Sequence, residues 1–403
     1  MKLHRNIALG IISGLEKTLI EKRPAADVLK KLLKINPIWG SRDRRSIAQA
    51  FYEIIRKKKF FHALTGPESE AENLWNLMGC WMVLNDFPLP EWVEFKNIDA
   101  EEIKAKAPVL VLDRKYKYSI PDWLDQICEE AFGEEIWEKE IESLNTPANL
   151  IIRVNTLLTT VEKLKEKLLK KYNIITSIVP DYPHALVFEK KQSLQKIKEY
   201  REGWFEVQDA NSQKISPWLK PESGKYYIDA CAGAGGKSLH LADLTKDSAK
   251  IVALDIYPAK LHELRKRCLR NKIESIQTVN VDVKGVFKTL KHNADGVLID
   301  APCSGLGVLK RNPDTKWNLT PERLTEILET QESILQTYAP MVKKGGNLVY
   351  ATCSILPIEN KLQIVKFLSS KLGSKFELEK EHTYFSHLTD FDGFYCARLI
   401  KKM

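Results

Sequence analysis

The sequence predicts a doubly wound, Rossmann-like α/β domain over residues 221–403, preceded by a helical domain and a small α+β unit. After Lys225, short β-rich runs alternate with helical stretches, which is typical of a parallel sheet with crossover helices. Before residue 115, apolar residues recur at the three-and-four spacing of amphipathic helices, and no glycine-rich loop interrupts them. With 403 residues, the chain is also long enough for two or three domains.

Residues 1–115 form the first predicted domain, which is helical. The apolar positions with helical spacing are Ile7, Leu9, Ile11, Ile12, Leu15, Leu19, Val28, Leu29, Leu32 and Leu33. Basic residues cluster at Arg42, Arg44 and Arg45, and again over residues 56–59, directly before two phenylalanines. Clustered cations beside aromatic side chains suit a polynucleotide, although a solvated helix face explains a single run of this kind about as often.

Residues 116–220 are predicted to be a linker followed by a small α+β subdomain. Pro121 occupies a position that suits the first turn of a helix, so a helix should start near Asp122. Farther along, helical segments mix with short apolar runs, such as the one at 150–152 before Arg153. The change of rhythm after Lys225 then sets the start of the third domain near residue 221.

The third domain is predicted to hold a seven-stranded, mostly parallel sheet. Its recognisable strands are YYIDA, IVALD, SIQTVNV, DGVLID and NLVYATC, and helical stretches separate them. Because parallel strands need crossover connections, helices should cover both faces of this sheet.

Composition and charge exclude several classes of protein. The chain has 62 Lys and Arg against 53 Asp and Glu, and this charge of +9 favours a polyanionic partner, although many proteins carry such a surplus for solubility alone. No apolar run approaches the roughly 20 residues that span a bilayer, so we expect a cytoplasmic protein without a membrane partner. Seven scattered cysteines, none in a C-x-x-C pair, argue against a disulfide framework and against a metal site.

A glycine-rich loop follows the first predicted strand of the α/β domain. The stretch DACAGAGGKS begins at Asp229 and opens a helix; its glycines let the backbone approach a ligand, although such turns also occur for packing alone. The next strand ends at Asp255, 19 residues after Gly236, where a carboxylate can bind both hydroxyls of a ribose. These features fit a nicotinamide cofactor or S-adenosylmethionine. The loop lacks the dinucleotide form G-x-G-x-x-G, which favours the methyl donor.

Two cysteines follow adjacent predicted strands, at the end of the sheet where α/β proteins bind their ligands. Cys303 comes three residues after Asp300, and Cys353 ends NLVYATC, so these thiols should nearly meet in space. Carbon 5 of cytosine attacks a methyl sulfonium only after a group adds to carbon 6, and a thiolate suits that reversible addition. Asp300 is placed to protonate ring nitrogen 3 or to hydrogen-bond with it. A second thiol can assist the loss of the carbon 5 proton.

A cysteine in apolar surroundings is usually a small buried hydrophobic residue. For Cys303 and Cys353, such a packing role is the alternative to a catalytic one. We assign the packing role to Cys80, Cys128, Cys268 and Cys396.

Six stretches of the chain form recognisable motifs. They are Arg153 to Asn155, GWFEVQDANSQ from Gly203, DACAGAGGKS, DAPCSGLGVLKRNPDTKW from Asp300, ATCS, and DGFYCARL from Asp392. Together they resemble the RsmB group, also called Sun or Fmu, of bacterial 16S ribosomal RNA cytosine-5 methyltransferases in the RsmB/NOP family. The resemblance covers nearly the whole chain. Where many members read C-A-A-P-G-G-K, this chain has Gly233 and Ala234, which loosens the loop without removing a backbone amide.

The resemblance implies roles for individual residues. It makes Cys353 the nucleophile and Cys303 the thiol that assists release, while Asp300 serves both the base and the cofactor. The residues implied for S-adenosylmethionine are Cys231, Ala232, Gly233, Ala234, Gly235, Gly236, Lys237, Asp255, Asp282 and Asp300. Asp255 should bind the ribose and Asp282 should lie near the adenine. The helical N-terminal region is similar to the NusB-like RNA-binding domain of this group.

Several alternatives for the function stay open. The catalytic motifs do not encode which RNA is bound, so a transfer RNA methyltransferase is the chief alternative to one acting on small-subunit ribosomal RNA. A non-catalytic RNA-binding assembly factor would have no use for the paired thiols and the complete loop, and a nicotinamide oxidoreductase would have no use for the thiols. We expect RNA as the partner, held by the basic N-terminal helices together with residues 153–156 and 203–213. We expect no DNA partner, and we expect the protein to be a monomer.

Overall fold

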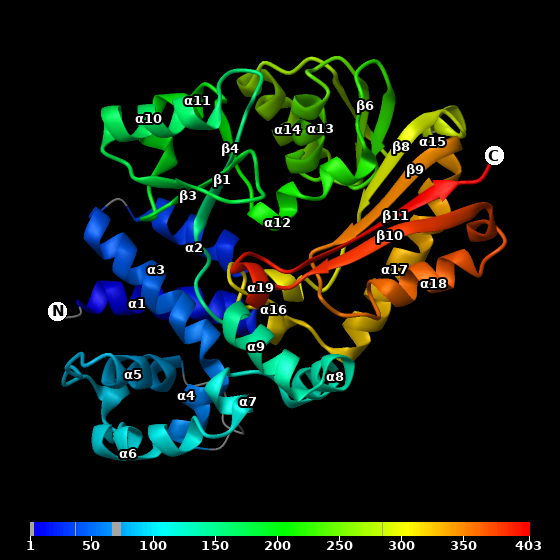
Figure 1. The fold of residues 1–403 in the computed structure, drawn as a ribbon. Coiled ribbons are helices and arrows are strands. Elements are labelled where there is room, and N and C mark those ends of the chain that lie inside the picture. The colour runs from blue at the N-terminus through cyan, green and yellow to red at the C-terminus, as the bar shows by residue number, and fades with distance from the viewer. Residues whose placement is uncertain (1–3, 37, 67–73, 284) are drawn as a thin grey trace. The chain divides into compact units, whose positions relative to one another are not determined.

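The computed structural model describes residues 4–36, 38–66, 74–283 and 285–403, and these form two compact units (Figure 1). One unit consists of the described residues of Met1–Thr146 together with Val308–Thr320. The other consists of Pro147–Gly307 and Pro321–Met403. The first is helical and the second contains two β-sheets, so the helical start and the α/β end predicted from the sequence are both confirmed.

Apolar side chains from residues 7–116, together with Trp317, form one core in the helical unit. The helices are α1 (Arg5–Leu15), α2 (Ala25–Ile35), α3 (Ser41–Arg56), α4 (Lys58–Thr65), α5 (Leu74–Leu84), α6 (Ala100–Leu110), α7 (Arg114–Lys117), α8 (Asp122–Phe132) and α9 (Glu134–Leu144). The predicted core positions Ile7, Ile11 and Leu15 are buried. Leu9 is 49% exposed, because it lies two residues from Ile7 and Ile11 and so on the opposite face of α1. No helix among the described residues is long and apolar enough to cross a bilayer.

The segment 308–320 belongs to the helical unit although it lies far along the chain from residues 1–146. It contains α16 (Thr315–Asn318), whose Lys316 is 1% exposed. The Lys316 ammonium donates to the backbone oxygens of Arg56 and Tyr118 at 2.9 and 3.0 Å, and to Asn145 Oδ1 at 3.1 Å. Burial lowers the pKa of Lys316 well below its ordinary value. The indole nitrogen of Trp317 donates to the backbone oxygen of Ile55 at 2.7 Å. Lys316 and Trp317 thus tie this segment to the rest of the helical unit.

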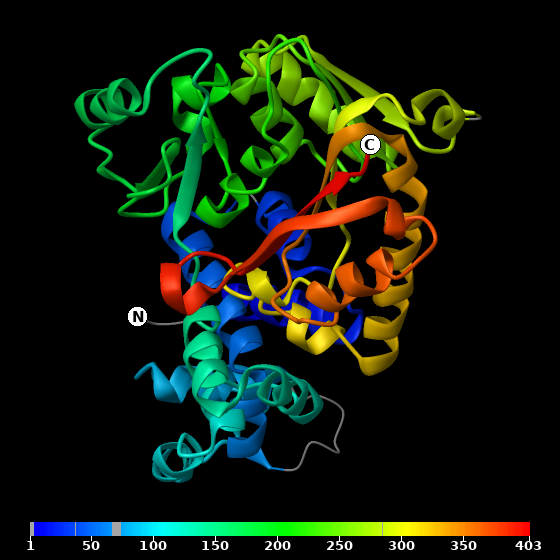
Figure 2. The same cartoon turned by 45° about the vertical axis from the view of Figure 1, so that its right-hand side comes forward.

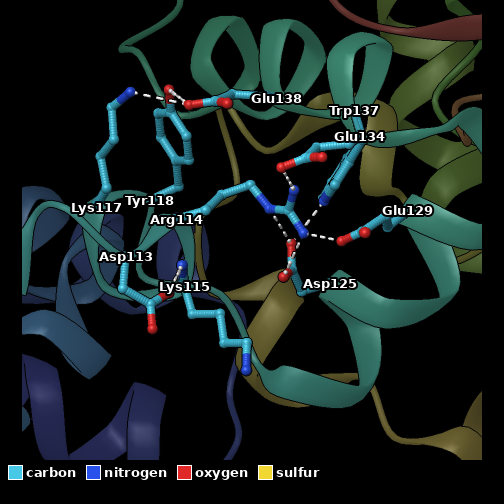
Figure 3. A network of polar contacts seen from close by, with 10 residues as sticks. All are labelled: Asp113, Arg114, Lys115, Lys117, Tyr118, Asp125, Glu129, Glu134, Trp137 and Glu138. Carbon is cyan, nitrogen blue, oxygen red and sulfur yellow. Dashed lines mark hydrogen bonds and ion pairs between the residues drawn. The ribbon is translucent and has the colours of Figure 1, made fainter.

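An ion-pair network around Arg114 joins α7, α8 and α9 (Figure 3). Arg114 donates from Nε and from one terminal nitrogen to the Asp125 carboxylate, each at 3.0 Å, and it also pairs with Glu129. The indole nitrogen of Trp137 donates to the same Asp125 carboxylate at 2.7 Å. The Asp125 side chain is 3% exposed, so it has lost most of its contact with water. Arg114 and Trp137 compensate for this loss by binding the buried negative charge.

A small antiparallel sheet opens the second unit. Its strands are β1 (Leu150–Val154), β2 (Thr176–Ile178), β3 (Ala185–Phe188) and β4 (Phe205–Val207), in the order β2-β3-β1-β4. Helix α10 (Val161–Tyr172) packs on this sheet through Leu164 and Leu168. This is the mixed helix and strand content that the sequence predicts for this region.

The large sheet has seven strands in the order β10-β11-β9-β8-β5-β6-β7. They are β5 (Tyr226–Asp229), β6 (Lys250–Asp255), β7 (Ile276–Asn280), β8 (Ala294–Asp300), β9 (Val342–Thr352), β10 (Phe376–Tyr384) and β11 (Phe394–Lys401). Strands β5 to β9 are parallel, and β10 and β11 are antiparallel additions at one edge. The five strands predicted by sequence and the mostly parallel sheet are therefore confirmed.

Helices cover both faces of this sheet (Figures 1 and 2). Helices α13 (Gly236–Leu244) and α14 (Pro258–Asn271) lie on one face. Helices α15 (Val286–Leu290), α17 (Pro321–Tyr338) and α18 (Lys361–Leu368) pack on the other through a continuous apolar core. This doubly wound arrangement leaves the carboxyl ends of the parallel strands as the place for a binding site.

Candidate active site

Cys303 and Cys353 meet at the carboxyl ends of β8 and β9. These strands pair in parallel with Asp300 opposite Ala351, and each cysteine follows its strand by one to three residues. Their Sγ atoms lie 3.3 Å apart, which confirms the predicted proximity. Both thiols are partly exposed. The four cysteines assigned to packing are buried, namely Cys80, Cys128, Cys268 and Cys396.

Two glycines bring the Cys303 loop against the Cys353 loop. The backbone nitrogen of Gly307 donates to the oxygen of Cys353 at 2.9 Å, and that of Gly393 donates to the oxygen of Gly307 at 2.7 Å. A Cβ atom at Gly307 would lie 2.1 Å from the Gly393 oxygen, so a larger residue does not fit. Gly393 belongs to the DGFYCARL motif, which therefore supports the thiol loops directly.

Lys237 and Asp300 form an ion pair beside the thiols. The Lys237 ammonium lies 2.5 Å from Asp300 Oδ2, and Lys237 is 8% exposed. Burial opposes the charged form of Lys237, but the Asp300 carboxylate outweighs it and raises the pKa of Lys237. The ammonium also lies 5.3 Å from the centre of the Phe394 ring, close enough for a cation–π contact. The positive charge is therefore fixed next to Asp300.

The two thiols differ in their electrostatic surroundings. A hydrogen bond with Cys353 is the largest cause that raises the pKa of Cys303 well above its ordinary value, and burial adds to it. Cys303 is therefore a neutral thiol that can donate its hydrogen toward the sulfur of Cys353.

The glycine-rich loop lies at the carboxyl ends of β5 and β6. Asp255 accepts hydrogen bonds from the backbone nitrogens of Gly233 and Tyr257, each at 2.8 Å. Gly235 has a φ of +86°, and a Cβ there would lie 2.0 Å from Leu264, so glycine is required at this position. The loop and Asp255 thus share one end of the sheet, as the sequence predicts.

Two glycines of the loop face open space. A Cβ at Gly233 or Gly236 would meet no atom within 4 Å. Asp229 is fully buried; Ser238 donates to its Oδ2 at 2.6 Å, whereas its Oδ1 has no hydrogen-bond partner among the described residues. Burial is the largest cause that raises the pKa of Asp229 to about 7. The loop therefore offers open backbone and a carboxyl oxygen, which suit a ligand with polar groups.

The remaining predicted cofactor residues lie at the same end of the sheet. Cys231 is partly buried, and burial raises the pKa of its thiol. Asp282 follows β7, the neighbour of β6, and is exposed, with its backbone nitrogen donating to Asn280 Oδ1 at 2.8 Å. Ile256 and Val283 directly follow the two aspartates and are 54% and 55% exposed. The sequence motifs did not single out these two apolar residues.

The structure does not support RNA contacts by Arg153 and Asn155. These residues are 1% and 2% exposed. Arg153 donates to the backbone oxygen of Gly236, and Asn155 donates to the backbone oxygens of Gly203 and Asn271 at 2.9 and 3.2 Å. They join the small sheet to α13 and α14, so the expectation that they grip RNA is wrong for these two side chains.

The 203–213 segment is likewise structural in its central residues. Glu206 is 3% exposed and pairs with Arg267 and Arg270, while Arg267 also donates to the backbone oxygen of Ala234 at 2.7 Å. Asn211 is fully buried and donates to the backbone oxygen of Asp392 at 2.9 Å. The segment therefore contacts the glycine-rich loop through Arg267, and it contacts the DGFYCARL motif, which supports the thiol loops, through Asn211.

Three of the seven basic cluster residues in the helical unit are also structural. Arg44 donates to the backbone oxygens of Asn36 and Trp39, which follow α2. Arg56 donates to the oxygens of Leu309 and Lys310, and Lys59 pairs with Asp122 at 3.0 Å. The cations of these clusters that remain exposed are Arg42, Arg45 and Lys57.

Comparisons with known proteins point to one family. Residues 216–400 match the model of the family described as 16S rRNA methyltransferase RsmB/F, and residues 120–195 match the RsmF/B-like ferredoxin-like domain. The chain is 36% identical to the probable ribosomal RNA small subunit methyltransferase B of Synechocystis sp., over 62% of this chain and 57% of that protein. It is 32% identical to ribosomal RNA small subunit methyltransferase B of Proteus mirabilis, over 71% of this chain and 67% of that protein.

A solved structure shares the fold over the full length. The crystal structure of PH0851 superimposes with a TM-score of 0.82 at 24% identity and covers 100% of both chains. The family resemblance seen in the sequence is confirmed by the matches to the family model and to curated relatives. The chain belongs to the RsmB/F family of 16S rRNA methyltransferases, which are S-adenosylmethionine-dependent cytosine-5 RNA methyltransferases.

Proposed function

We propose that this chain methylates carbon 5 of a cytosine in small-subunit ribosomal RNA, with Cys353 as the nucleophile and Cys303 as the thiol that assists release. The observation that supports this proposal is the pair of thiols 3.3 Å apart, at strand ends beside Asp300. A methyltransferase that acts on nitrogen or oxygen has no use for two adjoining thiols, because its target atom already has a lone pair.

The first step is the addition of the Cys353 thiolate to carbon 6 of the ring. Negative charge on Cys353 is one of the causes that raise the pKa of Lys237, so the ammonium and the sulfur interact favourably. Asp300 is proposed to pass a proton from the paired Lys237 ammonium to ring nitrogen 3, which takes up the electron pair displaced by the attack. Carbon 5 then becomes the nucleophilic end of an enamine.

The last step is the removal of the carbon 5 proton and the release of Cys353. Once Cys353 is a thioether it carries no charge, and the largest cause that raises the pKa of Cys303 disappears. Cys303 can then lose its proton to water, and its thiolate can accept the proton from carbon 5. The C–H electron pair restores the ring double bond as the bond from carbon 6 to Cys353 breaks.

The residues of the glycine-rich loop fit S-adenosylmethionine, which supplies the electrophilic methyl group when bound. The residues proposed to hold it are Cys231, Ala232, Gly233, Ala234, Gly235, Gly236, Lys237, Asp255, Asp282 and Asp300. Asp255 offers its free lone pairs to the ribose hydroxyls, and the unpartnered Oδ1 of Asp229 offers an acceptor for the ammonium group. Ile256 and Val283 are proposed to pack against the adenine.

RNA is proposed to bind through the exposed cations of the helical unit, Arg42, Arg45 and Lys57, with the target base drawn out of any stack into the thiol pocket. We keep the division into a helical RNA-binding domain at 1–115, a linker and α+β subdomain at 116–220, and a catalytic domain at 221–403 as part of this proposal. The proposal also includes a monomer that works in the cytoplasm and binds no DNA. The seven free cysteines suit a reducing compartment.

Alanine variants of the two thiols test the mechanism. Cys353→Ala should neither methylate nor form a covalent adduct with RNA. Cys303→Ala should attack and transfer the methyl group but stall before release, so a covalent protein–RNA complex should survive on denaturing gels. Adduct formation by Cys353→Ala and not by Cys303→Ala would reverse the roles, and wild-type turnover by both variants would refute the mechanism.

Tritium transfer from labelled S-adenosylmethionine identifies the RNA. We expect incorporation into small-subunit ribosomal RNA, whereas incorporation into transfer RNA alone would assign the other substrate, and none into either would indicate an assembly factor. Exchanging Arg42, Arg45 and Lys57 together for glutamine should weaken RNA binding and flatten its salt dependence. A matched triple exchange of the exposed Lys361, Lys366 and Lys371 in the second unit should change neither.

A further inference from the structure

Glu359 is a buried carboxylate that lies between the two thiol loops. It sits in the turn before α18, and it is fully buried. Its Oε2 accepts from the backbone nitrogen of Ser304 at 2.7 Å and from the side-chain amide of Gln331 at 3.1 Å. Its Oε1 accepts from the hydroxyls of Ser304 and Ser354, each at 2.5 Å. One side chain therefore bonds to both of the residues that directly follow the two cysteines.

The donors around Glu359 explain why a charge is tolerated there. Burying an ionised carboxylate is costly unless hydrogen bonds replace the water that it loses. Four neutral donors supply such bonds here, and hydrogen bonds to a charged acceptor are shorter and about twice as strong as neutral ones. A neutral side chain in this position would form weaker bonds to the two loops.

The turn that presents Glu359 is itself fixed. The Tyr350 hydroxyl donates to the backbone oxygen of Glu359 at 2.7 Å. The next residue, Asn360, accepts from the Thr352 hydroxyl at 2.5 Å and donates to the backbone oxygen of Ser354 at 2.9 Å. The Cys353 loop is thus bonded to the same turn on both sides of the cysteine, whereas the Cys303 loop reaches this turn through Ser304.

We propose that Glu359 is a positioning residue that holds Cys303 and Cys353 at the separation required for attack and release. This inference rests on the proposed function, since it concerns the same two thiols. Glu359 contacts neither sulfur through a hydrogen bond among the described residues, so it acts through Ser304 and Ser354. Its negative charge is also one of the causes that raise the pKa of Cys303, which helps to keep that thiol protonated before attack.

Disulfide formation between the two thiols measures their positioning without any need for RNA. Diamide takes two electrons and two protons from the Cys303 and Cys353 thiols and leaves a disulfide, whose geometry is strict enough to report small displacements. We expect Glu359→Gln to form this disulfide about tenfold more slowly than the wild-type protein, because its amide group faces one of the donors. Peptide mapping identifies the linked cysteines.

The control is Asp243→Asn, because Asp243 is also a buried carboxylate that accepts from one backbone nitrogen and one hydroxyl. Both donors belong to Thr156, at 3.0 and 2.5 Å, and neither lies on a thiol loop. Asp243→Asn removes a buried negative charge away from the thiol loops and should keep the wild-type rate of disulfide formation. In turnover with RNA, Glu359→Gln should lower kcat roughly 100-fold with KM for RNA unchanged, because a displacement of 1 Å costs about that much.

Each outcome decides the proposal. Wild-type rates of disulfide formation and of methylation in Glu359→Gln would overturn it, as would an equal slowing of disulfide formation in Asp243→Asn. If Glu359→Gln does not fold, Ser354→Ala removes one contact to the carboxylate and should slow the disulfide to a smaller extent; an unchanged rate there would refute the role. If the wild-type protein proves inactive on RNA, the proposed function fails, while the disulfide comparison still tests the positioning.

Discussion

The Asp255 carboxylate provides a sharp test of the cofactor site, because a second aspartate offers a matched control. Asp255 accepts one backbone N–H on each oxygen, from Gly233 and from Tyr257, at 2.8 Å. Asp247, ahead of the amino end of β6, accepts one backbone N–H on each oxygen in the same way, from Glu274 and Ser275 at 2.9 and 3.0 Å. Both aspartates therefore hold two chain segments together, but only Asp255 lies beside the glycine-rich loop.

An exchange of either aspartate for asparagine replaces one acceptor oxygen by an NH₂ group and removes the charge. Hydrogen bonds to charged groups contribute about 1.5 to 3 kcal/mol, so each variant should lose up to that amount of stability. In Asp255→Asn the same loss applies to the bond with the ribose. Since about 1.4 kcal/mol corresponds to a factor of ten in Kd, its affinity for S-adenosylmethionine should fall by roughly tenfold to a hundredfold.

Calorimetric titration with S-adenosylmethionine, together with urea unfolding, separates the two effects. Asp247→Asn should bind with the wild-type Kd despite its loss of stability. If Asp255→Asn also binds with the wild-type Kd, or if both variants weaken binding equally, the assignment of Asp255 to the ribose is wrong.

Three further predictions concern stability and the thiol loops. Burial raises the pKa of Asp229 to about 7, whereas its value in the unfolded chain is near 4. Between these two pH values the native state holds a proton that the unfolded state lacks. The free energy of unfolding should therefore fall by at most about 4 kcal/mol as pH rises through that window. Asp229→Asn should remove this slope in urea unfolding measured at pH 5 and pH 8. Arg114→Met leaves the Asp125 carboxylate buried without its cation and should cost about 3 to 5 kcal/mol in the same assay; a loss below 1 kcal/mol would contradict the role of the network. Gly307→Ala places a Cβ 2.1 Å from the Gly393 oxygen, so it should cost about 1 to 3 kcal/mol and slow methylation, and an unchanged melting temperature would count against this contact.

The parts of the site that lie on regular elements could be predicted from the sequence. Runs such as DGVLID and NLVYATC are buried parallel strands, and a residue at the end of such a strand has a known place in the sheet. That is why Cys303 and Cys353 could be expected to meet although 50 residues separate them. The position of Asp255 beside the glycine-rich loop follows from the same rule.

Residues that act through long-range contacts could not be predicted in this way. Glu359 is a single acidic residue in a turn, and its partner Ser304 lies 55 residues away in the sequence, so no local pattern marks it. Charge clusters were also ambiguous, because composition does not reveal which cation is buried. Arg56 and Lys59 belong to a basic run and are 6% and 8% exposed, each with a partner elsewhere in the chain.

The contribution of segment 308–320 to the helical unit affects how the protein is made. The carbonyl oxygen of Arg56 accepts a hydrogen bond from Lys316, which is synthesised 260 residues later. At about 5 to 20 residues per second, a ribosome that has passed residue 146 needs roughly 10 to 35 s to reach residue 320. During that time the first helices are present without the segment that fills their core. The order of synthesis therefore delays completion of the N-terminal unit until four of the seven strands of the large sheet have been translated.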